Sequence, residues 1–219
     1  MSQCPLCLSA DLQAFHQDKK RHYLQCQQCK LVTVPAEYHL CEADEKAFYD
    51  LHDNDVADEG YQRFLSRTLT PLLDKVLANE SHGDASDIIG LDFGCGEGAV
   101  LSQMAAKQGV KVMNYDLYYH NDPSLLALQF DFISMTEVIE HVHDAKALIT
   151  QLSAMLKAGG TLAIMTKRVL GQAEFVNWHY KNDPTHINFY SEATFEWLAR
   201  ELGWQLEVIG KDVVFFTKP

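Results

Sequence analysis

The 219-residue sequence predicts an α/β protein with a mostly parallel sheet, preceded by a small cysteine-rich module. From Asp87 onward, short apolar runs alternate with helical patterns, which is typical of strands covered by helices on both faces. A glycine-rich turn follows the first of these strands, and two Cys-x2-Cys pairs stand in the first thirty residues. A hydrophobic fraction of 47% is enough for a sizeable core.

The four N-terminal cysteines have the spacing of a structural zinc site. Cys4 and Cys7 form one pair, Cys26 and Cys29 form the other, and the 18 residues between the pairs lie in the range of zinc sites. Four thiolates bind zinc tetrahedrally and leave no open position for catalysis. Disulfides are the alternative, which a reducing cytosol disfavours. We predict a zinc-ribbon-like module over residues 1–35.

Residues 36–86 are predicted to form a helical connector. Apolar side chains recur at helical spacing over 42–52 and 59–78. Pro71 is expected to start a new helix or to kink the existing one. The polar residues 79–86 read as a loop that leads into the main domain.

Residues 87–219 are predicted to form the α/β domain itself. The expected strands are 88–93, 110–115, 130–136 and 161–166, with 204–209 and 213–217 joined as an antiparallel hairpin. The expected helices are 98–108, 144–157 and 191–202, with a turn at Gly159-Gly160. Only 13 residues separate Asp116 from Phe130, so one helix or strand of the usual pair is expected to be abbreviated.

Charge argues against nucleic acid as a ligand. The net charge is -12, of which residues 1–35 contribute +2 and the remainder -14, and an acidic body repels a phosphate backbone. Nucleic acid would depend on the cluster Lys19-Lys20-Arg21, for which we expect a solvated hairpin tip. No run is long enough to span a bilayer and no signal region precedes the first cysteine pair, so we expect a cytoplasmic protein without a membrane partner.

The glycine turn, Gly94-Cys95-Gly96-Glu97-Gly98-Ala99, lets backbone amides approach a ligand closely. The pattern also satisfies a dinucleotide-binding fingerprint, with Asp116 at the distance of a ribose-binding acid. However, the carboxylates of Asp92 and Glu97 oppose a pyrophosphate and suit a cationic ligand. A sulfonium cofactor without phosphate fits these residues better.

These motifs resemble those of class I S-adenosylmethionine-dependent methyltransferases over roughly residues 40–219. The resemblance is carried by residues 91–98, Asp116 and residues 130–142. It implies a Rossmann-like, mostly parallel sheet of the seven-stranded type with a closing antiparallel hairpin. Residues 137–142 and 185–191 are similar to the branch that contains ubiquinone-type O-methyltransferases, and the N-terminal module resembles zinc modules fused to deoxysugar C-methyltransferases.

The resemblance also implies the cofactor contacts. The expected residues are Gly94, Gly96 and Gly98 around the methionine part and the ribose, Asp92 near the amino group, Asp116 on the ribose hydroxyls, and Met135 and Thr136 beside the sulfonium. The family's acidic adenine contact falls in the shortened segment 117–129, where Asn121 or Asp122 is the candidate substitute. Cys95 is expected to be a small buried residue and not a nucleophile.

The first candidate base is His141, with Glu140 beside it to stabilise the protonated imidazole. Both follow the strand 130–136, at the edge where open α/β sheets bind ligands. The alternative is that they only pack the segment before the helix that Asp144 starts. His143 is expected to be exposed.

The second group of candidates lies in the long segment 167–190, where loops of this length are often lids or binding loops. Its aromatic side chains are expected to form an acceptor pocket, or else to pack against the closing helix as we expect for Phe189. His186 is a candidate for a second base or an acceptor contact, and Lys167 and Arg168 are candidates to hold an anionic group of the acceptor.

The sequence therefore favours S-adenosylmethionine-dependent methyl transfer to a small molecule, with zinc as a structural ion. The alternatives are an RNA methyltransferase that uses the zinc ribbon as reader, and a non-catalytic module that binds the cofactor as a sensor.

Overall fold

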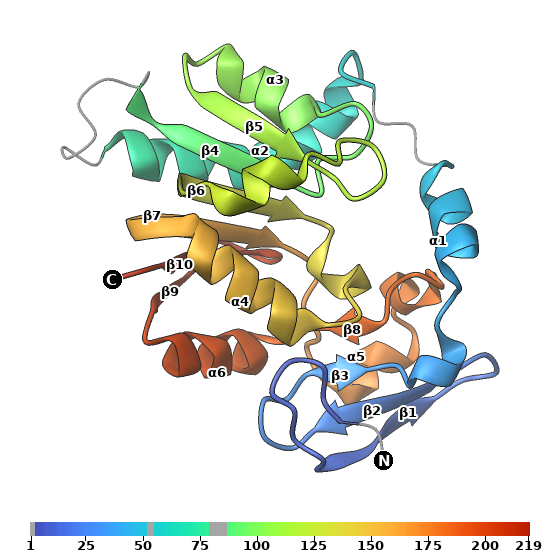
Figure 1. Cartoon of the computed structure of the whole chain (residues 1–219). Coiled ribbons are helices and arrows are strands. Elements are labelled where there is room, and N and C mark those ends of the chain that lie inside the picture. The colour runs from blue at the N-terminus through green and yellow to red at the C-terminus, as the bar shows by residue number, and fades with distance from the viewer. Residues whose placement is uncertain (1–2, 52–54, 79–86) are drawn as a thin grey trace. The chain divides into compact units, whose positions relative to one another are not determined.

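The computed structural model describes residues 3–51, 55–78 and 87–219, which form two compact units (Figure 1). The first unit combines Met1–His52, Ile139–Ile149 and Thr166–Leu202. The second combines Asp53–Val138, Thr150–Met165 and Gly203–Pro219. The domain limits at residues 35 and 86 stay predictions, and the predicted loop 79–86 lies outside the described residues.

The second unit contains a six-stranded sheet in the order β5-β4-β6-β7-β10-β9. The strands are β4 (Ile89–Phe93), β5 (Lys111–Tyr115), β6 (Phe130–Thr136), β7 (Leu156–Met165), β9 (Gln205–Val208) and β10 (Val213–Thr217). The first four of these pair in parallel, and β10 pairs antiparallel with both β7 and β9. The predicted mostly parallel sheet with a closing hairpin is therefore confirmed.

The sheet has one strand fewer than the predicted seven-stranded type in the described part of the chain. The short segment between β5 and β6 forms only the 3-10 helix η4 (Pro123–Ala127), which is the abbreviation that the sequence led us to expect. Asp122 starts η4 by accepting a hydrogen bond from the Ser124 amide at 3.0 Å.

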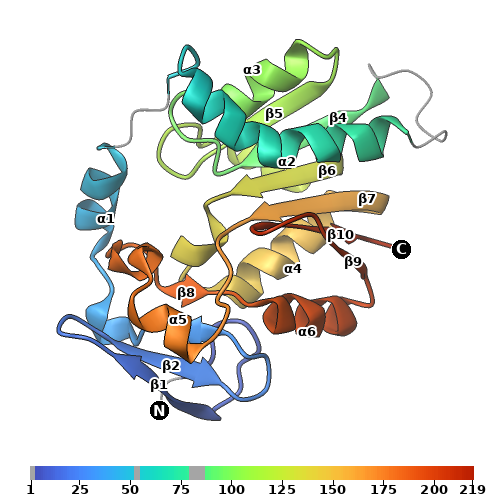
Figure 2. The ribbon, with the colours of Figure 1, turned by 180° about the vertical axis from the view of Figure 1, so that it is seen from behind.

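Helix α2 (Glu59–Leu77) continues through Pro71, so a second helix start there is wrong, and the alternative of a kink stays a prediction. The carboxylate of Asp58 starts the helix by accepting hydrogen bonds from the amides of Gly60 and Tyr61. Leu69, Leu72, Leu73 and Val76 of α2 are buried in the main core. This apolar face offsets the missing proline N–H, which costs about 3 kcal/mol in a helix interior. In Figure 2, α2 lies in front of β6 and β7.

The remaining helices of the main fold are α3 (Val100–Ala106) and α4 (Ala145–Met155). Strand β7 begins directly after α4, so Gly159 and Gly160 lie within the strand and not before it. The pairing with β6 is irregular there, since Leu156 pairs with Phe130 and Thr161 with Phe132, and Gly159 has a φ of +74°. The predicted turn is therefore an irregularity inside β7, which glycine permits. A Cβ atom on Gly160 would lie 2.9 Å from the Lys157 oxygen and 3.0 Å from the Asp131 oxygen, so glycine also permits a close approach.

The first unit is built on a four-stranded sheet in the order β1-β2-β3-β8. Its strands are β1 (Leu12–Gln17), β2 (His22–Cys26), β3 (Val32–Thr33) and β8 (Asn188–Phe189), and its helices are η1 (Ala36–Tyr38), α1 (Glu42–Tyr49), η5 (Ile139–His141), α5 (Gln172–Val176), η6 (His179–Asn182) and α6 (Glu192–Leu202). The cysteine module therefore does not close on itself. Its sheet is completed by β8, more than 150 residues later in the chain.

A core of aromatic and aliphatic side chains joins the cysteine module to the segment 167–190. Its buried members are Phe15, Tyr23, Val32, Val34, Val169, Phe175, Tyr180, Ile187 and Phe189. Phe189 contacts Phe175 with ring centroids 5.4 Å apart, so the prediction that it packs against the closing helix is wrong. Tyr190 makes that contact instead, stacked on Phe195 of α6. In the described residues, no helix is both long and apolar enough to cross a membrane.

Candidate functional site

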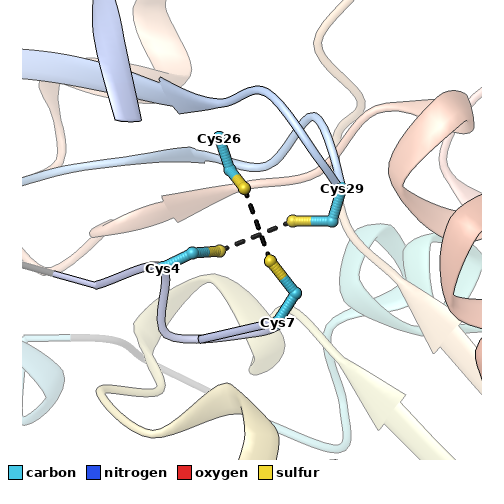
Figure 3. Close-up of side chains that lie close together, drawn as sticks. All are labelled: Cys4, Cys7, Cys26 and Cys29. Carbon is cyan, nitrogen blue, oxygen red and sulfur yellow. Dashed lines mark hydrogen bonds between the residues drawn. The ribbon is translucent and has the colours of Figure 1, made fainter. Parts of the chain in front are cut away.

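The four predicted metal ligands converge at one point in the first unit (Figure 3). The Sγ atoms of Cys4 and Cys29 lie 3.5 Å apart, and those of Cys7 and Cys26 lie 3.4 Å apart. All four are free cysteines, which excludes the disulfide alternative in this structure. A hydrogen bond from Cys29 lowers the pKa of Cys4 to about 5, whereas burial raises the pKa of Cys7 to about 12. Four sulfurs at this spacing can all be thiolates only with a cation between them, and tetrahedral thiolate coordination is the geometry of structural zinc.

The glycine turn at the end of β4 requires glycine at two positions. Gly94 and Gly96 have φ angles of +77° and +65°, in the left-handed region that side chains disfavour. A Cβ atom on Gly94 would lie 2.4 Å from a methyl group of Val138. The turn therefore keeps backbone exposed at the carboxyl end of the strand, where a ligand can approach it.

Asp116, at the end of β5, holds this turn in place. Its carboxylate accepts a hydrogen bond from the Gly96 amide at 3.0 Å, and it also accepts from the amides of Tyr118 and Tyr119. The imidazole of His120 contacts the Glu97 carbonyl oxygen at 3.0 Å. The acid predicted to bind ribose thus lies beside the glycine turn, and it orders the neighbouring backbone as well.

Asp92 is a buried acid at the end of β4, and only 4% of it is exposed. The hydroxyl of Ser134 donates a hydrogen bond to its carboxylate at 2.9 Å. Burial is the main cause that raises the pKa of Asp92 to about 7; the nearby charge of Asp116 acts in the same direction, and the hydrogen bond from Ser134 opposes both. A cation placed beside these two acids would be stabilised, so the arrangement fits a positively charged ligand.

Two neighbours of Asp92 add to the chemistry of this turn. Burial raises the pKa of Tyr61 to about 12, with the charges of Asp92 and Cys95 as further causes. Tyr61 packs against the main core, as its helical spacing in α2 predicts, and sequence reasoning missed that it also lies near Asp92. Burial also raises the pKa of the Cys95 thiol, which keeps it protonated and supports its predicted role as a small buried residue.

Met135 and Thr136, at the end of β6, differ in their capacity to form hydrogen bonds with a ligand. Met135 is fully buried within the sheet. The hydroxyl of Thr136 is enclosed and has no hydrogen-bond partner among the described residues. A buried unpaired hydroxyl costs about 1–3 kcal/mol, which a bound ligand would recover. Asn121 and Asp122 are exposed, and Asp122 starts η4. Their predicted contact with adenine stays a prediction.

The three predicted catalytic residues lie together in the first unit. Ligand atoms of Glu140, His141 and His186 are all within 4.8 Å of one another. Glu140 is fully buried and accepts a hydrogen bond from the Tyr180 hydroxyl. The imidazole nitrogen Nε2 of His141 lies 4.0 Å from the Glu140 carboxylate. Burial lowers the pKa of His186, which favours the neutral imidazole. The arrangement places the neutral His186 imidazole and the His141 ring beside a carboxylate that can stabilise an imidazolium. Carboxylate and imidazole donors also suit a divalent cation.

The comparisons with known proteins show which family the chain belongs to. A family model described as "Methyltransferase domain" matches residues 61–208, more than half of the chain. The chain belongs to this family of methyltransferase domains. A ubiquinone biosynthesis O-methyltransferase of Coxiella burnetii (strain Dugway 5J108-111) is 32% identical in a match that covers 35% of this chain and 42% of that protein. The aligned part is therefore less than half of the relative's length.

Solved methyltransferase structures resemble the methyltransferase domain at low identity. Magnesium protoporphyrin IX methyltransferase from Synechocystis PCC 6803, with bound SAH, is 14% identical with a TM-score of 0.49, and the match covers 81% of this chain and 94% of that one. The N-methyltransferase NodS from Bradyrhizobium japonicum WM9, in complex with S-adenosyl-L-homocysteine, is 15% identical with a TM-score of 0.49, covering 81% and 97%.

The expected acceptor pocket of the methyltransferase is largely a core instead. Phe175, Tyr180 and Phe189 are buried among the side chains of the cysteine module. Lys167 lies 3.0 Å from the His179 ring and over the ring of Tyr180, and Arg168 pairs with Glu192 at 3.5 Å. These two cations already have partners, so their predicted role with an anionic acceptor stays a prediction.

Replacing Asp92 by asparagine is expected to stabilise the protein in a pH-dependent way. Below its ordinary pKa of 3.8, Asp92 is protonated in both the folded and the unfolded state, so the variant gains little. As the pH rises from there to about 7, only the unfolded state ionises freely, and wild type loses stability that the variant keeps. We expect a gain on the order of a few kcal/mol near pH 8, measured by denaturant unfolding. The exposed Asp74→Asn is the control; an equal gain at both ends of the pH range would contradict the raised pKa.

Proposed function

We propose that this chain is an S-adenosylmethionine-dependent methyltransferase that acts on a small-molecule acceptor. The observation that carries the proposal is the glycine turn of a methyltransferase-family domain with the buried acid Asp92 beside it. The pair of acids Asp92 and Asp116 favours a cation and disfavours a pyrophosphate. The name of the Coxiella relative, an O-methyltransferase of ubiquinone biosynthesis, supports a small acceptor.

The proposed cofactor residues all belong to the second unit. Gly94, Gly96 and Gly98 would face the methionine part and the ribose, Asp92 the amino group, Asp116 the ribose hydroxyls, and Met135 and Thr136 the region of the sulfonium. When bound, S-adenosylmethionine supplies a methyl group that is already activated for in-line displacement. The protein then has to orient the acceptor and remove its proton.

Proton removal is the proposed role of Glu140, His141 and His186. Nitrogen Nε2 of either imidazole would take the acceptor's proton, and the Glu140 carboxylate would stabilise the resulting imidazolium. This chemistry suits an acceptor that loses a proton as the methyl group arrives on oxygen, carbon or nitrogen.

Zinc is the proposed occupant of the cluster formed by Cys4, Cys7, Cys26 and Cys29. A site with four protein sulfurs has no open position, so its role would be to hold the first unit together. The proposal presupposes a reducing compartment such as the cytoplasm, because the sulfurs must remain thiolates.

The RNA-reader alternative loses one of its three basic residues. Arg21 of the cluster Lys19-Lys20-Arg21 is buried, which corrects the expected solvated tip, so only the two lysines are exposed for a phosphate backbone. We propose no nucleic-acid partner. A salt-sensitive gel shift that Lys19→Ala and Lys20→Ala abolish would support RNA instead.

Calorimetry with S-adenosylmethionine tests the cofactor assignment. Folded, zinc-loaded protein is expected to bind it, and Asp116→Ala to weaken binding by about 10- to 100-fold, since it removes the ribose acceptors and the bond that holds the Gly96 amide. Asp74→Ala, which replaces an exposed acid of α2, serves as the control. Absence of binding by the wild-type protein would overturn the proposed function, and binding without transfer to any metabolite pool would favour the non-catalytic alternative.

A further inference from the structure

Arg21 is a buried cation at the tip of the β1–β2 hairpin. Only 6% of it is exposed, whereas the neighbouring Lys19 and Lys20 are exposed. An arginine that is withdrawn from water must have every N–H group satisfied, because each unpaired donor would carry a desolvation cost. The hydrogen-bond acceptors of Arg21 therefore show which segment of the chain the hairpin tip holds in place.

All five N–H groups of the Arg21 guanidinium have an acceptor. Nη1 donates to the backbone oxygens of His186 at 2.9 Å and Pro184 at 3.1 Å, Nη2 donates to those of Asp183 at 2.9 Å and Lys181, and Nε donates to the Tyr23 hydroxyl at 3.3 Å. Four of the five acceptors thus lie within residues 181–186. The planar guanidinium holds four carbonyl groups in one arrangement. The ammonium group of a lysine has too few donors and no fixed geometry to do the same.

The same backbone stretch orients both candidate bases. Nδ1 of His186 bonds to the Tyr180 carbonyl oxygen at 2.8 Å, and Nδ1 of His141 bonds to the Thr185 carbonyl oxygen at 3.2 Å. A carbonyl oxygen only accepts, so each Nδ1 must carry a hydrogen, and in the neutral ring each Nε2 then carries the lone pair. The conformation of residues 180–186 therefore sets the ring orientation and the tautomer of both imidazoles.

The cysteine module also holds the next residues through its sheet. Strand β3 pairs with β8, and the amide of Val34 donates to the Ile187 carbonyl oxygen at 2.8 Å. Ile187 in turn donates to the Glu140 carbonyl oxygen at 2.9 Å. One set of backbone bonds thus runs from the cysteine module through residue 187 to Glu140.

We propose that Arg21 is a positioning residue for methyl transfer: it clamps residues 181–186 so that His141 and His186 present Nε2 to the acceptor. The proposal rests on the proposed function and gives the cysteine module its task. That task is to hold the backbone that orients the proton-accepting cluster.

Arg21→Ala in the full-length, zinc-loaded protein tests the clamp. At a temperature where the variant is folded, kcat is expected to fall on the order of 10- to 100-fold, the loss typical of a misplaced catalytic group, while the Kd for S-adenosylmethionine stays unchanged. Millimolar guanidinium is expected to restore part of kcat by refilling the vacated site. Arg21→Lys keeps the positive charge but lacks the planar guanidinium group. Its kcat is expected to be lower than that of Arg21→Ala with added guanidinium. Lys20→Ala, an exposed neighbour, is the matched control.

Nitrogen-15 NMR of the histidine rings gives a readout that does not depend on turnover. In wild type, both His141 and His186 are expected as the Nδ1–H tautomer, and Arg21→Ala is expected to give mixed tautomers. A folded Arg21→Ala variant with wild-type kcat and unchanged ring signals would overturn the proposal. Guanidinium that restores the stability of the variant without raising its kcat would overturn it as well. Failure of the wild type to bind S-adenosylmethionine would overturn the proposed function alone, because the ring signals report on the clamp separately.

Discussion

Replacing Cys4 by serine is expected to release the metal and unfold the first unit, with loss of all methyl transfer. Cys4 is fully buried against Cys29, and a serine hydroxyl is a poor ligand for zinc. The binding free energy of structural zinc, about 10–16 kcal/mol in small modules, is folding free energy that no apolar core of this size replaces. Elemental analysis is expected to fall from one zinc per chain to none, with loss of the near-ultraviolet signal of the Tyr23 and Phe175 cluster.

The matched control is Cys41→Ser, because Cys41 is exposed and lies outside the four-sulfur cluster. It is expected to retain the metal and the activity. S-adenosylmethionine binding is expected to survive Cys4→Ser better than turnover does, since every proposed cofactor residue lies in the second unit. Wild-type protein that folds and contains no zinc would contradict the metal assignment.

Replacing Glu140 by glutamine is expected to lower kcat by about 10²- to 10⁴-fold, the usual contribution of acid–base catalysis. The amide keeps the shape of the side chain and still accepts a hydrogen bond from Tyr180, but it cannot stabilise an imidazolium at His141. The Kd for S-adenosylmethionine is expected to change little. Transfer of labelled methyl groups to an acceptor, with calorimetry alongside, measures both quantities.

Glu196→Gln, an exposed acid of α6, is the control for the loss of one negative charge. A Glu140→Gln variant that turns over within about threefold of wild type would remove the carboxylate from the proposed mechanism. Turnover is expected to be independent of added Mg²⁺ or Mn²⁺. A strict requirement for such an ion would instead assign Glu140, His141 and His186 to a divalent cation.

Local patterns predicted most of the second unit. Phe130–Thr136 and Val213–Thr217 are continuous apolar runs, and both are strands with the predicted limits. Asp144 and Ser191 accept hydrogen bonds from amides three residues later, as helix-starting residues should. The second helix start expected at Pro71 was wrong, and the turn at Gly159-Gly160 lies inside β7 and not before it, because packing outweighed a local preference. In both places the buried neighbours determine the backbone path.

Some residues of the candidate site were predicted from the sequence and others were not. Cysteine spacing and the glycine turn each placed their residues correctly, because a metal or a turn needs particular side chains at fixed intervals. That Tyr61 also lies near Asp92 was missed, because a tyrosine in an apolar helical face looks like core. Arg21 was assigned to solvent because basic residues at a hairpin tip are usually exposed.

Residue spacing was enough to predict the four-sulfur cluster, the parallel sheet and the glycine turn, since each depends on particular residues at fixed intervals or on a repeating period. Only the tertiary structure showed that β8 completes the sheet of the cysteine module and that Arg21 binds the carbonyl groups of residues 181–186, some 160 positions away. The physical reason is that these contacts use backbone groups. Every residue carries a carbonyl oxygen, so no side-chain pattern indicates which ones a buried guanidinium will bind.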